Sequence, residues 1–140
     1  MIDVDAELVA AATEARDRSY APYSNFTMGA AVRCADGTIV HGALVENVSL
    51  GLAMCAERTA LFATVARGLD PVALALVAER TSGELTYPCG ACAQVALELA
   101  GPSLPVVVAE PNGAAHAIQL ADLLPRGPHR HTYEPGPQHE

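Results

Sequence analysis

The stretch YPCGACAQV, residues 87–95, places Cys89 and Cys92 between a proline and a run of helix-forming residues. A helix N-terminus carries partial positive charge, which favours the thiolate form of cysteine. Cys55 stands at the predicted start of another helix, in MCAERTAL, and Glu57 follows two positions later. If Cys55 caps that helix and Glu57 lies in its first turn, both side chains can approach one point. The pattern therefore predicts a site that is built from two helix starts.

Hydrophobic periodicity and turn residues divide the rest of the chain into helices and strands. The predicted helices cover about residues 5–18, 55–67 and 90–100, and the predicted strands cover about 26–34, 38–45, 72–78, 104–109 and 115–118. Asp36 and Gly37 form a hairpin signal between the first two strands. The order helix, hairpin, helix, strand, helix, strand predicts a three-layer α/β/α sandwich with a mixed sheet of about five strands.

The composition is that of a globular, acidic protein, with 140 residues, 51% of them hydrophobic, and a formal net charge of −8. All eight basic residues are scattered arginines, so we expect no nucleic acid partner and a small-molecule substrate. The apolar runs are strand-sized and no signal peptide is evident, so we expect no membrane contact and a cytoplasmic location. One domain is expected over residues 1–125, followed by a C-terminal tail over 126–140 that lacks periodicity.

The cysteine usage indicates metal chemistry. In a reducing cytosol the four cysteines are poor candidates for disulfides, and Cys34, at the end of an apolar strand, is expected to be a buried thiol. The other three would leave a tetrahedral zinc ion with one open position, as in catalytic zinc sites. Zinc lowers the pKa of a water molecule in that position, and Glu57 could then carry protons. This arrangement suits hydrolytic deamination of an amino-substituted heterocycle.

The spaced pair CAE, residues 55–57, and PCGAC, residues 88–92, resembles the zinc-dependent cytidine deaminase family. The segments SYAPYSNFTMGAAV, VENVSLGLAMCAERTALF and ADLLP extend the resemblance over roughly residues 15–125. The resemblance implies a cytosine-type nucleoside as substrate, release of ammonia, and a homotetramer with active sites near the subunit interfaces. It also implies that Glu57 is the proton shuttle and that one zinc ion per chain is held by Cys55, Cys89 and Cys92.

The same resemblance assigns further residues to the site. Phe26 matches the aromatic side chain beside the substrate, and Glu46 matches the glutamate that hydrogen-bonds the ribose. The backbone of Ala56 is expected to contact the base. Arg58 matches the arginine that offsets the excess negative charge of a three-thiolate site in the small tetrameric members.

Four positions depart from the family pattern. Leu44 stands where an asparagine is expected on the substrate side, Leu50 replaces a tyrosine, Ala93 an arginine and Pro128 a phenylalanine. The apolar Leu44 cannot hydrogen-bond a sugar hydroxyl, so the preferred substrate is expected to differ from plain cytidine. A nucleoside antibiotic or another modified aminopyrimidine, as in the related blasticidin-S deaminases, is the alternative substrate.

Two other interpretations of the cysteines are open. Cys89 and Cys92 could form a redox pair, but a thioredoxin-like context is missing and Cys55 would have no role. The three cysteines could hold a structural zinc ion in a protein without catalysis, although such a site has no need of Glu57. Ammonia release distinguishes the enzyme from both, and a reversible Cys89–Cys92 disulfide without zinc identifies the redox protein.

Overall fold

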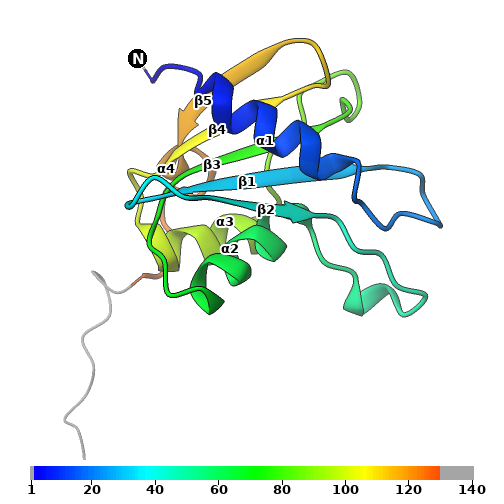
Figure 1. The fold of residues 1–140 in the computed structure, drawn as a ribbon, viewed down its shortest axis with the longest axis horizontal. Coiled ribbons are helices and arrows are strands. Elements are labelled where there is room, and N and C mark those ends of the chain that lie inside the picture. Colours follow the sequence, from blue (N-terminus) through cyan, green and yellow to red (C-terminus); the bar gives the residue numbers. More distant parts are fainter. Residues whose placement is uncertain (1, 130–140) are drawn as a thin grey trace, which may run out of the picture.

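A mixed five-stranded sheet forms the centre of residues 2–129, the part of the chain that the computed structural model describes (Figure 1). The strands are β1 (Met28–Cys34), β2 (Ile39–Ala43), β3 (Pro71–Ala78), β4 (Pro105–Ala109) and β5 (Ala115–Gln119). They lie in the order β2-β1-β3-β4-β5, with β3 and β4 parallel and the other neighbouring pairs antiparallel. The predicted mixed sheet of about five strands is confirmed.

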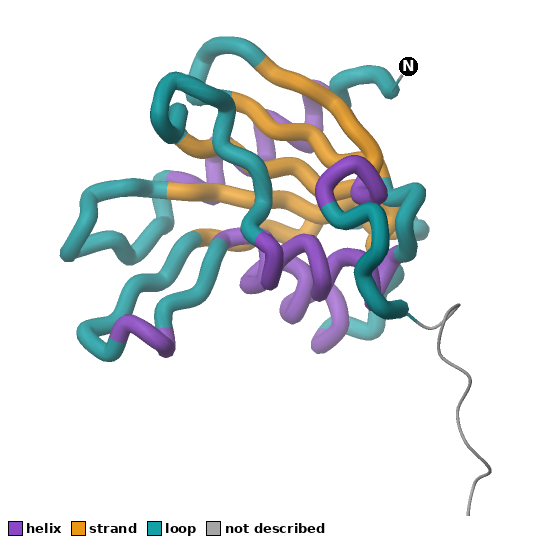
Figure 2. The backbone as a smooth tube through the Cα atoms, turned by 180° about the vertical axis from the view of Figure 1, so that it is seen from behind, coloured by secondary structure: helices purple, strands orange, loops and turns teal. Residues whose placement is uncertain are grey.

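Helices cover both faces of the sheet and complete the predicted three layers. The helix α1 (Ala6–Arg16) crosses one face, in front of the sheet in Figure 1 and behind it in Figure 2. The helices α2 (Ala56–Ala66) and α3 (Gly90–Ala100) pack against each other on the opposite face. The 3-10 turn η1 (Leu50–Leu52) and the short helix α4 (Leu120–Leu123) lie in the connecting segments.

The sheet separates two hydrophobic cores, because successive side chains of a strand point to opposite faces. The core under α1 is small and rich in alanine, and its buried members are Leu8, Ala12, Ala31, Ala75, Val77, Val107 and Ala109. The core under α2 and α3 holds larger side chains, among them Leu61, Leu74, Leu76 and Leu97. The helices that carry the cysteines therefore rest on the larger core.

Two strand glycines allow the helices to lie directly on the sheet. A Cβ atom on Gly42 of β2 would lie 2.5 Å from the carbonyl oxygen of Ala56 and 2.6 Å from the Cβ of Ala60. A Cβ atom on Gly29 of β1 would lie 2.7 Å from the Cα of Arg16 in α1. These distances exclude any side chain, so glycine sets how closely α2 and α1 approach the sheet.

Asp5 fixes the start of α1. Its Oδ1 accepts a hydrogen bond from the Leu8 amide at 3.1 Å, which caps the helix. The same carboxylate accepts hydrogen bonds from Nε and Nη2 of Arg33 in β1, at 2.9 and 3.0 Å. The pKa of Asp5 is lowered, chiefly by the hydrogen bond from Arg33. One charged pair thus fastens α1 to the sheet.

Both strands of the predicted hairpin are shorter than expected. β1 begins two residues later, after Asn25 turns the chain with a left-handed φ of 59°. β2 ends two residues earlier, since the carbonyl of Leu44 accepts a hydrogen bond from the Tyr20 amide at 2.8 Å and Val45 pairs with Met54. The chain leaves the sheet at this point and runs toward the cysteine-bearing helix.

The segment after α4 lies against α3, where the side-chain amide of Gln94 donates to the carbonyl oxygen of Pro128 at 2.8 Å. Residues 130–140, most of the predicted tail, lie outside the described residues. The division into a domain over 1–125 and a tail over 126–140 therefore stays a prediction. No helix within residues 2–129 is long and apolar enough to cross a membrane.

Candidate metal centre

Three cysteine side chains from two helix starts meet at one point. Cys55 and Cys89 are the N-cap residues of α2 and α3, both with extended backbone, and Cys92 lies in the first turn of α3. Their Sγ atoms all lie within 4.8 Å of one another, and those of Cys89 and Cys92 are 3.5 Å apart. Within residues 2–129 no other group of three potential metal-ligating side chains is so close together. The predicted meeting of the two helix starts is confirmed.

The spacing of the sulfur atoms fits a tetrahedral zinc ion. Zn–S bonds of about 2.3 Å place two tetrahedral sulfur ligands about 3.8 Å apart, whereas a disulfide requires about 2.05 Å. The cysteines are free, and thiolates are ligands that zinc prefers. Cys55, Cys89 and Cys92 are therefore the zinc ligands. Three protein ligands leave the fourth position for water or substrate.

Glu57 is buried beside the cysteines, in the first turn of α2. Its side chain is 1% exposed, and within the described part of the chain neither carboxylate oxygen has a hydrogen-bond partner. Burial raises the pKa of Glu57 to about 7, and the negative charge of Cys55 acts in the same direction. Burying a carboxyl group without a hydrogen-bond partner costs free energy. The position of Glu57 is therefore suited to a hydrogen bond with a molecule that binds in the site, such as water or substrate.

Cys55 carries negative charge more readily than Cys92. Its pKa is lowered to about 5, chiefly by the hydrogen bond from the Cys92 thiol and then by Arg58. The pKa of Cys92 is raised, because its thiol donates a hydrogen bond to Cys55. Burial of the Cys92 thiol and the negative charge of Glu57 nearby act in the same direction. Arg58 Nη2 lies 3.7 Å from the Cys55 sulfur, and this contact raises the pKa of the guanidinium. A cation among the sulfur atoms is what would allow all three to be thiolates together.

The residues expected on the substrate side lie just before β1, just after β2 and at the start of α2. Ala56 is buried and Leu44 is 9% exposed, and both belong to the core under α2 and α3. Phe26 is half-buried and packs against the same core. Glu46 Oε1 accepts hydrogen bonds from the backbone amides of residues 23–24, at 3.0 and 3.3 Å. This contact joins Glu46 to the loop that precedes β1.

The positions that depart from the family pattern have different surroundings. Leu50 in η1 is 86% exposed, so its side chain offers an apolar surface to solvent. Ala93, next to the zinc ligand Cys92, is buried in α3. Pro128 meets α3 through its carbonyl oxygen, which accepts a hydrogen bond from the side-chain amide of Gln94. An arginine at position 93 would have no room without rearrangement, which is consistent with the alanine there.

One contact beside the cysteines was not predicted from the sequence. The hydroxyl group of Tyr87, two residues before Cys89, forms a hydrogen bond with Nδ1 of His116 in β5 at 3.0 Å. The spacing of the histidines indicates only surface residues, and nothing local connects His116 with Tyr87. The contact depends on the pairing of β4 with β5, which periodicity does not reveal.

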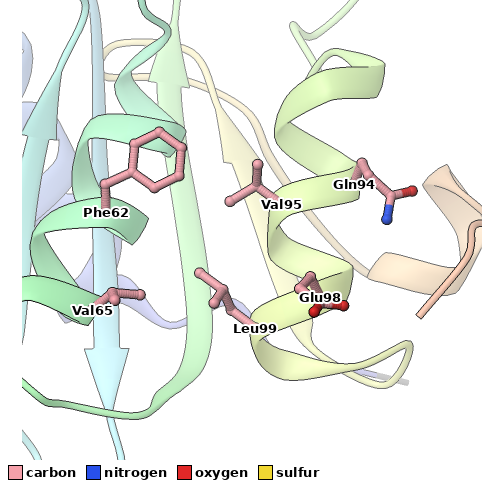
Figure 3. A pocket seen from close by; sticks show the side chains of 6 residues that line it. All are labelled: Phe62, Val65, Gln94, Val95, Glu98 and Leu99. Carbon is pink, nitrogen blue, oxygen red and sulfur yellow. The ribbon is translucent and has the colours of Figure 1, made fainter. Parts of the chain in front are cut away.

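A groove lies on the outer side of α2 and α3, with a volume of about 440 Å³. In Figure 3 Phe62 and Val65 of α2 face Val95 and Leu99 of α3 across it. Phe62 and Val65 are 46% and 53% exposed. None of the zinc ligands lines this groove, so it is separate from the metal centre.

A family of known sequences matches the greater part of the chain. The family described as the cytidine and deoxycytidylate deaminase zinc-binding region matches residues 1–88. The match includes Cys55 and Glu57 and ends immediately before Cys89.

Similar proteins extend the likeness beyond residue 88. The cytidine deaminase of Sporosarcina psychrophila is 43% identical over 125 residues, which are 89% of this chain and 90% of that protein. The cytidine deaminase of Mycobacterium tuberculosis (strain H37Rv) is 40% identical over 126 residues, again 89% and 90% of the two chains. The crystal structure of cytidine deaminase from Burkholderia pseudomallei superposes with a TM-score of 0.82 at 47% identity, covering 89% of this chain and 99% of that one.

Proposed function

Because this chain belongs to the cytidine deaminase family, we propose that it catalyses the hydrolytic deamination of cytidine or a closely related cytosine nucleoside. The products are the corresponding uracil nucleoside and ammonia. The observation that carries this proposal is the placement of a buried, unpartnered Glu57 beside three thiols that fit zinc. A redox pair has no use for the third thiol, and a structural zinc site has no use for the carboxyl group.

The proposed chemistry assigns one task to the metal and another to the protein. Zinc bound by the three thiolates would activate a water molecule near neutral pH. Glu57 takes up a proton from the attacking water and returns one to the amine that leaves the ring as ammonia. A pKa of about 7 is suited to both transfers, because neither protonation state is then strongly favoured at neutral pH. The buried surroundings also keep bulk water from competing for the proton.

Arg58 is proposed to moderate the charge of the site. Three thiolates carry more negative charge than one zinc ion neutralises, and excess negative charge weakens the activation of water. The guanidinium group at 3.7 Å from the Cys55 sulfur is placed to offset part of that charge. Its interaction with Cys55 would reduce the charge that the sulfur donates to the metal.

Four residues are proposed to bind the substrate. The aromatic ring of Phe26 would lie beside the base, and the backbone of Ala56 would contact its polar edge. Glu46 would accept a hydrogen bond from a sugar hydroxyl, using the oxygen that the amides of residues 23–24 leave available. Leu44 would offer the sugar only an apolar surface, and its small exposed fraction limits that surface.

Leu44 also supports a second candidate, a nucleoside analogue or antibiotic as the preferred substrate. A panel of cytidine, 2′-deoxycytidine, free cytosine and blasticidin S, assayed for ammonia release, would separate the two substrates. A higher kcat/KM for cytidine than for blasticidin S would exclude the second candidate.

The homotetramer expected for the small members of the family is also proposed for this chain, in the cytoplasm. The exposed apolar side chains of the groove between α2 and α3 support an interface at that face. Sedimentation equilibrium of the full chain tests the assembly. Replacing Phe62 by Glu should shift the protein toward smaller species if that face is buried between subunits.

The test of the proposed reaction is the Glu57→Gln variant. Glutamine keeps the shape of the side chain and cannot shuttle protons, so kcat should fall by about a hundredfold or more while the zinc content stays unchanged. Glu14→Gln, the same change on the exposed side of α1, is the matched control and should leave kcat unchanged. Near-normal turnover by Glu57→Gln would overturn the assigned role. Zinc binding by the native chain without ammonia release from any cytosine compound would identify a structural zinc protein instead.

A further inference from the structure

The segment that delivers two of the zinc ligands is tied to a distant hairpin. Residues 79–89 connect β3 to α3 and end at Cys89. At one end of this connection Arg80 contacts Glu110, in the turn between β4 and β5, with Nε–Oε2 and Nη2–Oε1 distances of 2.9 and 3.3 Å. At the other end, the hydroxyl of Tyr87 and Nδ1 of His116 are 3.0 Å apart. Two contacts with one hairpin therefore hold both ends of the connection.

The remainder of the connection is held by its own hydrogen bonds. The Thr86 hydroxyl donates to the carbonyl oxygen of Glu79 at 2.6 Å, and Arg80 Nη1 donates to that of Gly83 at 3.0 Å. Thr81 and Glu84 exchange backbone hydrogen bonds at 2.9 and 3.1 Å. The loop thus has a defined shape without the Tyr87–His116 contact, and that contact acts only on its last residues.

The position of Tyr87 makes it effective on the ligand. Pro88 follows it, is buried and has a backbone φ fixed by its ring, so the path from Tyr87 to Cys89 has little freedom. His116 is paired with Val108 of β4, whose side chain is buried in the core. The two aromatic rings meet edge to face, with centroids 6.5 Å apart and an interplanar angle of 82°. The sheet therefore provides a rigid support for Tyr87, which lies two residues before the zinc ligand Cys89.

Cys89 is the ligand that most needs such support. It is exposed, whereas Cys92 is buried and Cys55 is half-buried. A ligand at the end of a loop and outside the core has fewer packing contacts to hold it than Cys92 within α3. We propose that Tyr87 and His116 are positioning residues that hold Cys89 in the geometry required for zinc and so slow the loss of the metal. This proposal depends on the zinc centre assigned above and not on the identity of the substrate.

The test measures zinc release from the loaded protein into excess of a chromogenic chelator. Tyr87→Phe removes only the hydroxyl group, and His116→Phe removes its partner while keeping an aromatic ring. Each variant should release zinc about two- to tenfold faster than the native chain, the range expected for the loss of one neutral hydrogen bond. The double variant should release zinc no faster than either single variant, because both changes remove the same contact.

Matched controls and a conservative replacement separate positioning from general stability. Tyr20→Phe and His41→Phe make the same chemical changes at exposed sites away from residues 79–89 and should release zinc at the native rate. His116→Asn, whose side-chain amide can take the place of Nδ1, should restore a rate close to native. Thermal unfolding of the chelator-treated proteins should differ little between Tyr87→Phe and the native chain.

Two results would overturn the proposal. Unchanged zinc release in both Tyr87→Phe and His116→Phe would show that the contact does not act on the ligand. Faster release accompanied by an equal loss of stability in the chelator-treated protein would show a general structural role. If the native chain bound zinc and released no ammonia, the proposed function would fail, yet the comparison of release rates would still decide this proposal.

Discussion

Replacing Gly42 by alanine should displace the helix that begins at the first zinc ligand. The added Cβ would lie 2.5 Å from the carbonyl oxygen of Ala56, whereas ordinary contact begins at 3.4 Å. The helix must therefore rise by about 0.9 Å, the difference between these two distances, or the strand must fall away by as much. Ala56 directly follows Cys55, so the ligand moves with the helix start.

A movement of that size is large for a metal site and moderate for the fold. Zinc–ligand distances are kept within about 0.2 Å, so a shift of about 0.9 Å should greatly weaken the bond to Cys55. Overpacking of one methyl group costs about 1–3 kcal/mol in unfolding free energy. For a chain of this length that loss corresponds to a fall of roughly 3–10 °C in Tm.

Gly29→Ala is the matched control on the other face of the sheet. Its Cβ would collide with the backbone of α1 at Arg16, and α1 carries no zinc ligand. Both variants should lower the Tm of the chelator-treated protein by similar amounts. Only Gly42→Ala should also lose zinc affinity, by about tenfold or more on the scale of perturbed metal sites. Zinc binding of native strength in a folded Gly42→Ala protein would refute the argument that this glycine sets the position of Cys55.

Three further predictions concern the metal, the first helix and the sugar. Cys89→Ala should lose zinc, whereas Cys34→Ala, at a buried cysteine outside the metal centre, should keep it. Metal analysis of the purified proteins tests both variants, and full zinc occupancy in Cys89→Ala would contradict the ligand assignment. Asp5→Asn should destabilise the fold by about 1 kcal/mol at pH 7, because asparagine keeps the helix cap and loses the pair with Arg33. The pKa of Asp5 is lowered in the fold, so the difference in unfolding free energy between the native chain and Asp5→Asn should shrink as the pH falls below about 4 and the native carboxylate is protonated. Urea unfolding at several pH values measures this difference. A difference that does not change with pH would contradict the prediction. Leu44→Asn should raise kcat/KM for cytidine relative to 2′-deoxycytidine, because an amide can form a hydrogen bond with a sugar hydroxyl. An unchanged ratio of the two kcat/KM values in steady-state assays would show that position 44 does not face the sugar.

The zinc ligands could be identified from the sequence because the relevant chemistry is local. A cysteine that begins a helix is placed by that helix alone, and two such starts with CAE and PCGAC spacing leave few other arrangements. The helices themselves follow from apolar periodicity and from Gly68 and Gly101, which end α2 and α3 with positive φ values. The layered class of the fold follows from the order of these elements.

Features that depend on contacts between segments far apart in the chain could not be predicted from local sequence patterns. Periodicity identifies β4 and β5 but gives neither their neighbours nor their register, so the meeting of Tyr87 with His116 is invisible in the sequence. The early end of β2 coincides with a hydrogen bond from the Tyr20 amide to the carbonyl of Leu44, a contact between residues far apart in the sequence. The burial of Glu57 without a partner is likewise a property of the assembled fold.

The sheet also divides the molecule into a half that holds the metal centre and a half that does not. Every zinc ligand and Glu57 stand on the side of α2 and α3, whereas the alanine-rich core under α1 touches none of them. Stabilising substitutions often reduce activity when they stiffen or distort a catalytic site. Substitutions that repack the core under α1 at constant volume should therefore change the stability of the protein without moving a zinc ligand.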